Sequence, residues 1–184
     1  MRIISGTARG TKLFTLDGTN TRPTLDRVKE PLFNILNFRL QDAIVLDLFA
    51  GSGALGLEAI SRGATKAIFC EHDRNAANII EKNIEKTRFK DESLLIKGEF
   101  EVALKQIKKD GTKVDIVFLD PPYKTDLIYK SIKLIIDLEI LNEDAIIMLE
   151  TDEPVRIQDE IKDLSVKIFD IRKYGRVSLL FMQQ

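Results

Sequence analysis

Residues 43–56 read AIVLDLFAGSGALG, an apolar run that leads through a glycine-rich turn into a helical pattern. The apolar run is typical of a buried strand. Gly51, Gly53 and Gly56 match the fingerprint that lets a backbone pass close to a nucleotide ligand before a helix begins. This stretch therefore predicts a strand, a ligand-binding turn and a helix, which together open a Rossmann-like α/β fold.

Beyond this unit, short apolar runs continue to alternate with helical patterns. Such alternation predicts a parallel sheet with helices on both faces and ligands at the carboxyl ends of the strands. The tail differs, because residues 166–175 and 176–183 predict two strands joined by a tight turn, which would form a C-terminal antiparallel hairpin. We therefore expect a seven-stranded, mostly parallel sheet. The other apolar runs are 66–71, 93–97, 114–120 and 145–150, the first run extends over 43–49, and the helical patterns are 54–62, 74–87, 100–109 and 126–138.

The first part of the chain lies outside this alternation. We expect a single domain over residues 1–184, with a basic hairpin and helix extension over 1–40 and the Rossmann-like core over 41–184. Within the extension, the sequences RIISG and TKLFTL predict a small hairpin around Thr7–Gly10.

A helix is expected to follow this hairpin, in the sequence TRPTLDRVKEPLFNIL. Pro31 is awkward there, because proline removes a backbone hydrogen bond and crowds the preceding turn. The helix is therefore expected either to begin late, near Glu30, or to be kinked at Pro31.

Composition excludes several classes of protein. Among 184 residues, 28 Lys and Arg balance 29 Asp and Glu, which is typical of a soluble protein. No apolar run approaches the length of a membrane span, and the polar N-terminus does not resemble a signal peptide. The single cysteine, Cys70, lies in an apolar run and predicts a buried strand thiol. We therefore expect neither a disulfide nor a zinc framework, no other metal, no membrane association and a cytoplasmic location.

Charge is distributed unevenly along the chain. Residues 1–40 carry seven basic and three acidic residues, a net charge of +4, and the remaining 21 basic and 26 acidic residues give −5. A basic arm on an acidic body is a plausible surface for contacting phosphates. A solvated loop would look similar, so the pattern supports a nucleic-acid partner without establishing one.

Two carboxylates bear on whether the glycine-rich turn holds NAD or S-adenosylmethionine. Glu71 lies twenty residues after Gly51, at the end of the second apolar run, where a carboxylate binds ribose hydroxyls of either cofactor. Asp47 lies four residues before Gly51, where it would repel a pyrophosphate. The same charge would attract the ammonium and sulfonium groups of S-adenosylmethionine. Electrostatics therefore favours S-adenosylmethionine.

Further cofactor contacts are expected just past the strands. Glu99 could hydrogen-bond the adenine amine and Phe100 could cover its ring, although an ordinary helix start with a core phenylalanine fits equally well. His72 reads as a polar loop residue beside the ligand pocket rather than a catalytic group. The expected cofactor-binding residues are Asp47, Phe49, Ala50, Gly51, Ser52, Gly53, Glu71, His72, Glu99 and Phe100.

The apolar run 114–120 ends in Asp120-Pro121-Pro122-Tyr123, a sequence suited to methylating an exocyclic amine of a base. The lone pair of such an amine is delocalised into the ring, so the amine is a poor nucleophile. The Asp120 carboxylate and the Pro121 carbonyl can each accept a hydrogen bond from one of the two N–H groups of the amine. Both hydrogen bonds strengthen as the nitrogen becomes positive. The prolines fix the backbone, and Tyr123 can stack on a base that has left its helix.

These motifs resemble the RsmD family of ribosomal RNA (guanine-N2)-methyltransferases over nearly the whole chain. The glycine block and the proline pair are common to many amino-methyltransferases, whereas the N-terminal pieces are more specific to this family. The matching pieces are Arg2–Gly6, Arg9-Gly10, Lys12-Leu13, Arg22–Thr24, Asp26–Val28, Leu32–Asn34, LDLFAGSGALGLEAISRGA (46–64) and Asp120–Tyr123.

The resemblance implies a methyltransferase that uses S-adenosylmethionine on N2 of one guanine, position 966, in 16S ribosomal RNA. By carry-over, Asp120, Pro121, Pro122 and Tyr123 would hold the guanine amine. The family also suggests that the basic segment with Arg22, Thr24 and Arg27 lies over the pocket and binds the substrate. Because the chain is less basic than an RNA enzyme ideally is, a small ribosomal subunit or an assembly intermediate is the expected partner.

Direct transfer of the methyl group from sulfur to the amine fits the sequence. The alternative, C5 methylation of a pyrimidine, would require a catalytic cysteine, and the single cysteine of this chain is expected to be a buried strand thiol. Three alternatives stay open at this point. A DNA adenine-N6 or cytosine-N4 methyltransferase can use the same tetrapeptide, but it usually needs an added recognition domain. A nicotinamide-dependent oxidoreductase is opposed by Asp47. A catalytically silent module could bind the cofactor and a ribosomal partner.

Overall fold

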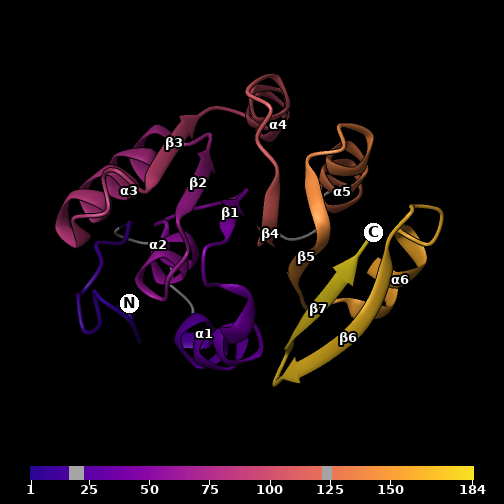
Figure 1. The fold of residues 1–184 in the computed structure, drawn as a ribbon. Helices are drawn as coiled ribbons and strands as arrows, with labels where there is room; N and C mark the ends of the chain where they lie inside the picture. The colour runs from indigo at the N-terminus through magenta and orange to yellow at the C-terminus, as the bar shows by residue number, and fades with distance from the viewer. Residues whose placement is uncertain (17–22, 122–125) are drawn as a thin grey trace.

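The computed structural model describes residues 1–16, 23–121 and 126–184, and the side chains of 23–27 lie outside the described part. A seven-stranded sheet runs through it (Figure 1). Its strands are β1 (Ile44–Asp47), β2 (Lys66–Glu71), β3 (Ser93–Lys97), β4 (Val114–Leu119), β5 (Leu141–Thr151), β6 (Lys167–Tyr174) and β7 (Val177–Gln183). The helices are α1 (Pro23–Ile35), α2 (Ala54–Ser61), α3 (Arg74–Thr87), α4 (Phe100–Lys109), α5 (Leu127–Asp137) and α6 (Pro154–Glu160), with a short 3-10 helix η1 (Asn37–Arg39).

The strand order is β3-β2-β1-β4-β5-β7-β6. The first five strands are parallel, whereas β7 pairs antiparallel with both β5 and β6. This arrangement confirms the expected Rossmann-like α/β fold, with a seven-stranded, mostly parallel sheet and a C-terminal antiparallel hairpin. The chain moves outward from β1 through β2 to β3 and then returns to the other side of β1 as β4. Ligands of such sheets bind where the order reverses, at the carboxyl ends of the strands.

Apolar side chains cover both faces of the sheet, as expected of strands that read as continuous apolar runs. One face packs against α4, α5 and α6, through Leu104, Ile132 and Ile157 among others. The other face packs against α1, α2 and α3, through Phe33, Ala59 and Ile80. Figure 1 shows α4 and α5 together on one side of the sheet and α1 and α2 on the other. The carboxyl edge between these layers is left for the site.

Most of the predicted elements fall where the sequence places them, and β2, β3, α3 and α4 match their expected ranges. Strand β5 begins at Leu141 rather than 145, because Leu141 pairs with Val114 ahead of a register shift in the β4–β5 ladder. Helix α6 has no counterpart among the predicted elements. Its seven residues are too few to show a helical period in the sequence.

The N-terminal hairpin is present in reduced form. Arg2 and Lys12 make one isolated antiparallel bridge, and Ile3 and Thr11 are joined by a backbone hydrogen bond of 3.0 Å. The expected late start of the following helix, near Glu30, is wrong. Helix α1 begins at Pro23, a position where a missing N–H group costs nothing, and it continues through Pro31. Burial of Val28, Leu32, Phe33 and Leu36 against the sheet offsets the cost of the internal proline.

The N-terminal segment (residues 1–14) is fastened to the end of α2. Ser61 Oγ accepts the Ala8 N–H at 3.0 Å and donates to the Ser5 carbonyl at 2.6 Å, and the Thr7 N–H donates to the Ser61 carbonyl. Gly6 has φ +82°, and a Cβ atom there would lie 1.6 Å from the Ser61 carbonyl oxygen. Only glycine therefore allows this close approach.

Gly6→Ala is expected to lower the free energy of unfolding by more than about 1 kcal/mol, because it adds a clash to a left-handed backbone conformation. Gly10→Ala is the matched control, since Gly10 has φ +86° but nothing within 4 Å of the added Cβ atom. Urea denaturation of both variants measures the difference. Equal losses in the two variants would show that the Ser61 contact does not constrain the segment.

Candidate active site at the carboxyl edge of the sheet

Three carboxylates meet where the strand order reverses. Asp47 is the last residue of β1, Glu71 is the last residue of β2, and Asp120 follows the last residue of β4. Strands β1 and β4 are direct neighbours, with Asp47 opposite Phe118 in the register. The Asp47 carboxyl feels the charges of both Asp120 and Glu71. The residues expected on either side of the methyl transfer therefore share one edge of the sheet.

Between β1 and α2, the glycine turn (residues 49–53) is shaped by backbone conformations that favour glycine. Gly51 and Gly53 have φ values of +54° and +75°. The Gly51 N–H donates to Glu71 Oε2 at 2.8 Å, and the Ala50 N–H donates to the Cys70 carbonyl at 3.0 Å. The end of β2 thus fixes the turn directly.

Glu71 is oriented from two sides, because its other oxygen, Oε1, accepts the Asp73 N–H at 2.8 Å. A carboxylate offers about four lone pairs, so two backbone bonds leave acceptor capacity for the hydroxyl groups of a ribose. Asp73 in turn caps α3 by accepting the Ala76 N–H at 2.8 Å. The β2–α3 junction therefore presents Glu71 in a fixed orientation beside the glycine turn.

Asp47 has a role within the fold that the sequence analysis missed. Its Oδ2 accepts the Gly56 N–H at 3.0 Å, in the first turn of α2. Burial raises the pKa of the Asp47 carboxyl to about 7; the Gly56 bond opposes this shift, and the charges of Asp120 and Glu71 add to it. The site is therefore an enclosed, electronegative environment, which suits a cationic ligand.

The raised pKa of Asp47 predicts a pH dependence of stability. The pKa of this carboxyl lies at about 7 in the folded protein, well above its ordinary value of 3.8, so the folded state holds the proton more tightly. The resulting stabilisation is complete below the unfolded pKa and is lost as the pH rises through about 7. Asp47→Asn keeps an acceptor for Gly56 without the titration. We expect the unfolding free energy of the unliganded wild type to fall between pH 5 and 7 relative to this variant, by urea denaturation; parallel curves would refute the shift.

The ring pair Phe49–Phe100 lies beside the end of β2. The two ring centroids are 6.0 Å apart, and Phe100, the first residue of α4, is buried. Glu99 precedes α4, and its side chain makes no capping hydrogen bond. Glu99 and Glu71 both act on the Cys70 thiol, whose pKa is raised to about 12, first by burial and then by these charges. Cys70 is thus the buried, protonated thiol that the sequence predicts.

The remaining predicted site residues differ in how far the structure places them. The His72 side chain is 60% exposed, and its Nδ1 lies 3.5 Å from Glu71 Oε1, as expected of a polar residue at the rim. Pro121 is buried directly after Asp120. Arg22, Pro122 and Tyr123 lie outside the described residues, and for Thr24 and Arg27 only the helical backbone of α1 is described.

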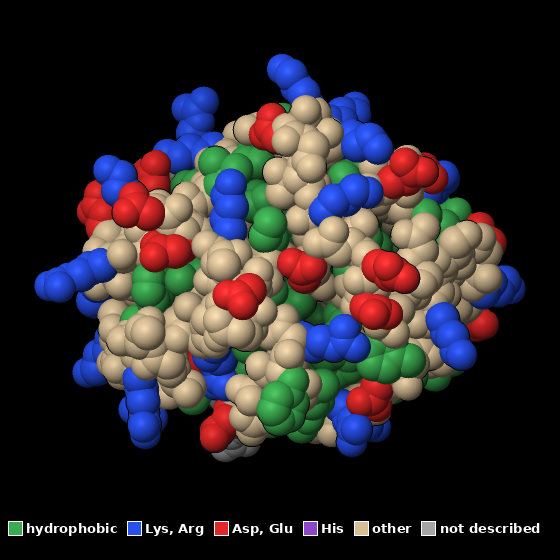
Figure 2. Space-filling view, in the orientation of Figure 1, with side chains coloured by type: hydrophobic (Ala, Val, Ile, Leu, Met, Phe, Trp, Pro, Cys, Tyr) green, Lys and Arg blue, Asp and Glu red, His purple; other side chains and the backbone are tan. Residues whose placement is uncertain are grey.

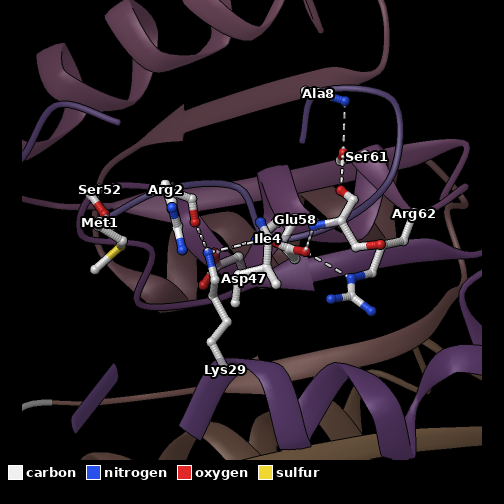
Figure 3. A network of polar contacts seen from close by, with 12 residues as sticks. Met1, Arg2, Ile4, Ala8, Lys29, Asp47, Ser52, Glu58, Ser61 and Arg62 are labelled. Carbon is white, nitrogen blue, oxygen red and sulfur yellow. Dashed lines mark hydrogen bonds and ion pairs between the residues drawn. The ribbon is translucent and has the colours of Figure 1, made fainter. Parts of the chain in front are cut away.

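Two buried polar residues near the site were not singled out from the sequence. Glu58, inside α2, accepts the backbone N–H groups of Ile4 and Ser5 at 2.7 and 3.0 Å and pairs with the Lys29 ammonium at 3.1 Å (Figure 3). A charged residue within the otherwise apolar sequence ALGLEAIS could have drawn attention to it. Asn83, on α3, contacts both the N-terminal segment and the glycine turn. Its partners are distant in sequence, so no local pattern indicates them.

The chain is similar to proteins of a known family. The family model named Conserved hypothetical protein 95 matches residues 1–183. Ribosomal RNA small subunit methyltransferase D of Haemophilus influenzae is 39% identical over 153 residues, which cover 83% of this chain and 79% of that protein. The chain belongs to the RsmD family of methyltransferases.

Two further matches come from Escherichia coli. Ribosomal RNA small subunit methyltransferase D of strain K12 is 40% identical over 152 residues, covering 83% of this chain and 75% of that protein. The solved structure of the candidate methyltransferase yhhF is 35% identical, with a TM-score of 0.85, and covers 100% of this chain and 97% of that chain. The match therefore includes the N-terminal segment as well as the sheet.

Within the described residues, no group of three or more His, Cys, Asp or Glu side chains could hold a metal ion. In that same part of the chain, every helix is too short or too polar to cross a membrane.

Proposed function

We propose that this chain transfers a methyl group from S-adenosylmethionine to N2 of guanine 966 in 16S ribosomal RNA. The observation that carries the proposal is the meeting of Asp47, Glu71 and Asp120 at one edge of the sheet, in a chain of the RsmD family. Membership supports the reaction class and the RNA substrate, since the relatives carry the name small subunit methyltransferase. The site chemistry supports the amine as the target.

S-adenosylmethionine would bind across the glycine turn. Glu71 would accept the ribose hydroxyl groups, because its oxygens are already oriented by the N–H groups of Gly51 and Asp73. The ring pair Phe49–Phe100 would lie against the adenine, with Glu99 accepting its amine. The buried charge of Asp47 favours the sulfonium and ammonium groups, and it would disfavour the pyrophosphate of NAD.

The guanine amine would meet the donor methyl beside Asp120. The Asp120 carboxylate and the Pro121 carbonyl would accept hydrogen bonds from its two N–H groups. These hydrogen bonds would turn the nitrogen lone pair out of the ring plane. The lone pair then attacks the methyl carbon in line with the breaking carbon–sulfur bond, which releases S-adenosylhomocysteine. The nitrogen carries a positive charge until one of its protons passes to water. Positioning the two reactants accounts for much of the rate.

The target base has to be accessible from outside a helix, because N2 of a paired guanine is occupied by base pairing. Tyr123 would stack on the extruded base, and Arg22, Thr24 and Arg27 would contact the neighbouring RNA. On the face shown in Figure 2, Lys and Arg side chains lie mostly near the outline of the molecule, and Asp and Glu side chains lie both among them and in the middle of the face. Such mixed charge favours a ribosomal particle, whose proteins share in recognition, over naked RNA.

Tritiated methyl transfer onto naked 16S rRNA, small ribosomal subunits and DNA tests this proposal. We expect counts in the subunit sample and 2-methylguanosine after digestion to nucleosides. Label in N6-methyladenine or N4-methylcytosine of DNA would instead identify a DNA methyltransferase. A parallel titration with S-adenosylhomocysteine and NADH tests the cofactor, and binding of NADH alone would overturn the assignment.

A further inference from the structure

The side chain of Asn83 joins two parts of the molecule that the sequence separates widely. Its Oδ1 accepts the Phe14 N–H at 2.7 Å, and its Nδ2 donates to the Phe14 carbonyl at 3.0 Å and to the Ser52 carbonyl at 2.9 Å. Phe14 closes the N-terminal segment, and Ser52 lies in the glycine turn. One amide group therefore holds both against α3.

The geometry leaves Asn83 little freedom. The residue is fully buried, and both N–H bonds of its amide are used by backbone carbonyls. The Phe14 ring is held by the same helix, since the Lys86 ammonium lies 4.2 Å from its centroid. Exchange of the Asn83 amide for any side chain without both donors and acceptors would leave buried backbone groups unsatisfied, which is costly.

The opposite end of the N-terminal segment is anchored on the other helix that borders the turn. Glu58 of α2 accepts the Ile4 and Ser5 N–H groups, and the Lys29 ammonium donates to the Arg2 carbonyl at 2.6 Å. Figure 3 shows this network together with the contact between Met1 and Ser52, whose sulfur and oxygen atoms are 3.7 Å apart. The segment thus spans from α2 to α3 across the glycine turn.

We propose that Asn83 is a positioning residue that couples the N-terminal segment to the glycine turn, so that cofactor binding and docking of the segment stabilise each other. This inference rests on the proposed use of S-adenosylmethionine at that turn. Any ligand that orders the turn also holds the Ser52 carbonyl in place for Asn83, and Asn83 then holds Phe14. Coupling of this kind is reciprocal, so the segment in turn raises cofactor affinity.

Such coupling gives the basic N-terminal segment a further use. Arg2, Arg9 and Lys12 lie on it, so RNA that contacts the segment would favour the same docked state as the cofactor. Binding of RNA and binding of cofactor would then be cooperative without direct contact between the two ligands.

Asn83→Asp tests the coupling. The carboxylate keeps an acceptor for the Phe14 N–H but turns both donated bonds into repulsion between oxygen atoms. We expect the dissociation constant of S-adenosylhomocysteine, measured by calorimetry on the full chain, to rise about tenfold. Asn78→Asp is the matched control, because Asn78 is an exposed asparagine on the same helix, and its affinity should stay at the wild-type value.

A loss of stability alone could mimic this result, so a second control is needed. Ile135→Ala removes buried side-chain volume from α5, away from the glycine turn, and should lower the melting temperature without changing the affinity. Hydrogen exchange of the wild type supplies a readout that needs no variant. S-adenosylhomocysteine should slow exchange of the Phe14 amide, whose acceptor is Asn83.

The outcomes separate this inference from the proposed function. The coupling would be overturned if Asn83→Asp bound S-adenosylhomocysteine with wild-type affinity, or if the ligand did not change the exchange rate of the Phe14 amide. Either result would leave the proposed function intact. Failure of S-adenosylhomocysteine to bind the wild type would overturn both. The positioning role would be supported if Asn83→Asp bound S-adenosylhomocysteine more weakly while both control variants kept the wild-type affinity, and if the ligand slowed exchange of the Phe14 amide.

Discussion

Asp120→Ala is expected to lower methyl transfer by a factor of about 10³, with the affinity for S-adenosylhomocysteine changed by less than about threefold. The size follows from the loss of a preorganised acceptor for charge that develops only in the transition state. The cofactor affinity is retained because the expected cofactor contacts lie at the ends of β1 and β2, in the glycine turn and at the start of α4 rather than at the end of β4. Single-turnover assays with small ribosomal subunits measure the rate, and calorimetry measures binding.

Asp126→Ala provides a matched control for this experiment. Asp126 lies shortly after Asp120 in the sequence, but its side chain is exposed and pairs with Lys130 on α5. The same chemical change should therefore leave the rate close to that of the wild type. Full activity in Asp120→Ala would remove Asp120 from the reaction. Loss of cofactor binding together with activity would make Asp120 a cofactor ligand instead.

Glu58→Ala is expected to lower the free energy of unfolding by about 3–5 kcal/mol, the usual effect of removing one partner from a buried ion pair. Glu58 and Lys29 are both fully shielded from solvent in their side chains, and Arg62 Nε also donates to Glu58, at 2.8 Å. The substitution additionally takes the acceptor from the Ile4 and Ser5 N–H groups. Chemical denaturation measures the loss.

Glu81→Ala shows what an exposed ion pair contributes. Glu81 pairs with Lys97 at 2.8 Å, but both side chains are about half exposed, so the expected loss is about 1 kcal/mol or less. The double variant Lys29→Met/Glu58→Met should recover part of the stability lost in Glu58→Ala, because it removes both buried charges. A loss in Glu58→Ala no larger than in Glu81→Ala would contradict the anchoring role of Glu58.

The alternation of apolar runs with helical patterns was sufficient to predict the sheet and the edge at which its parallel strands end. Strand β2 is one continuous apolar run and helix α3 shows one strong helical period, and neighbouring parallel strands place their carboxyl ends at the same edge of the sheet. That geometry is why Asp47, Glu71 and Asp120 could be assigned to one site before the fold was known. The start of β5 was not predicted because its pairing with β4 determines it, and α6 was not predicted because seven residues are too few to show a helical period.

Contacts between distant residues explain the rest of what the sequence could not reveal. Glu58 accepts the N–H of Ile4, 54 positions away, and Asn83 accepts the N–H of Phe14, 69 positions away, so no local pattern indicates the partners of either residue. Asp47 illustrates a different limit. Its carboxylate lies at the predicted edge of the sheet, but its bond to the Gly56 N–H depends on how α2 packs over the end of β1. The position of α1 likewise follows from packing, which overrides the low helix propensity of Pro31.

Mass spectrometry of the 16S rRNA fragment that contains guanine 966 tests the proposed activity most directly. The RNA would come from a bacterial strain that lacks methylation at this position and expresses this chain. We predict that the fragment gains one methyl group, recovered as 2-methylguanosine, and that the Asp120→Ala chain adds none. A fragment without added methyl, or a methyl group on a different nucleotide, would contradict the proposed reaction.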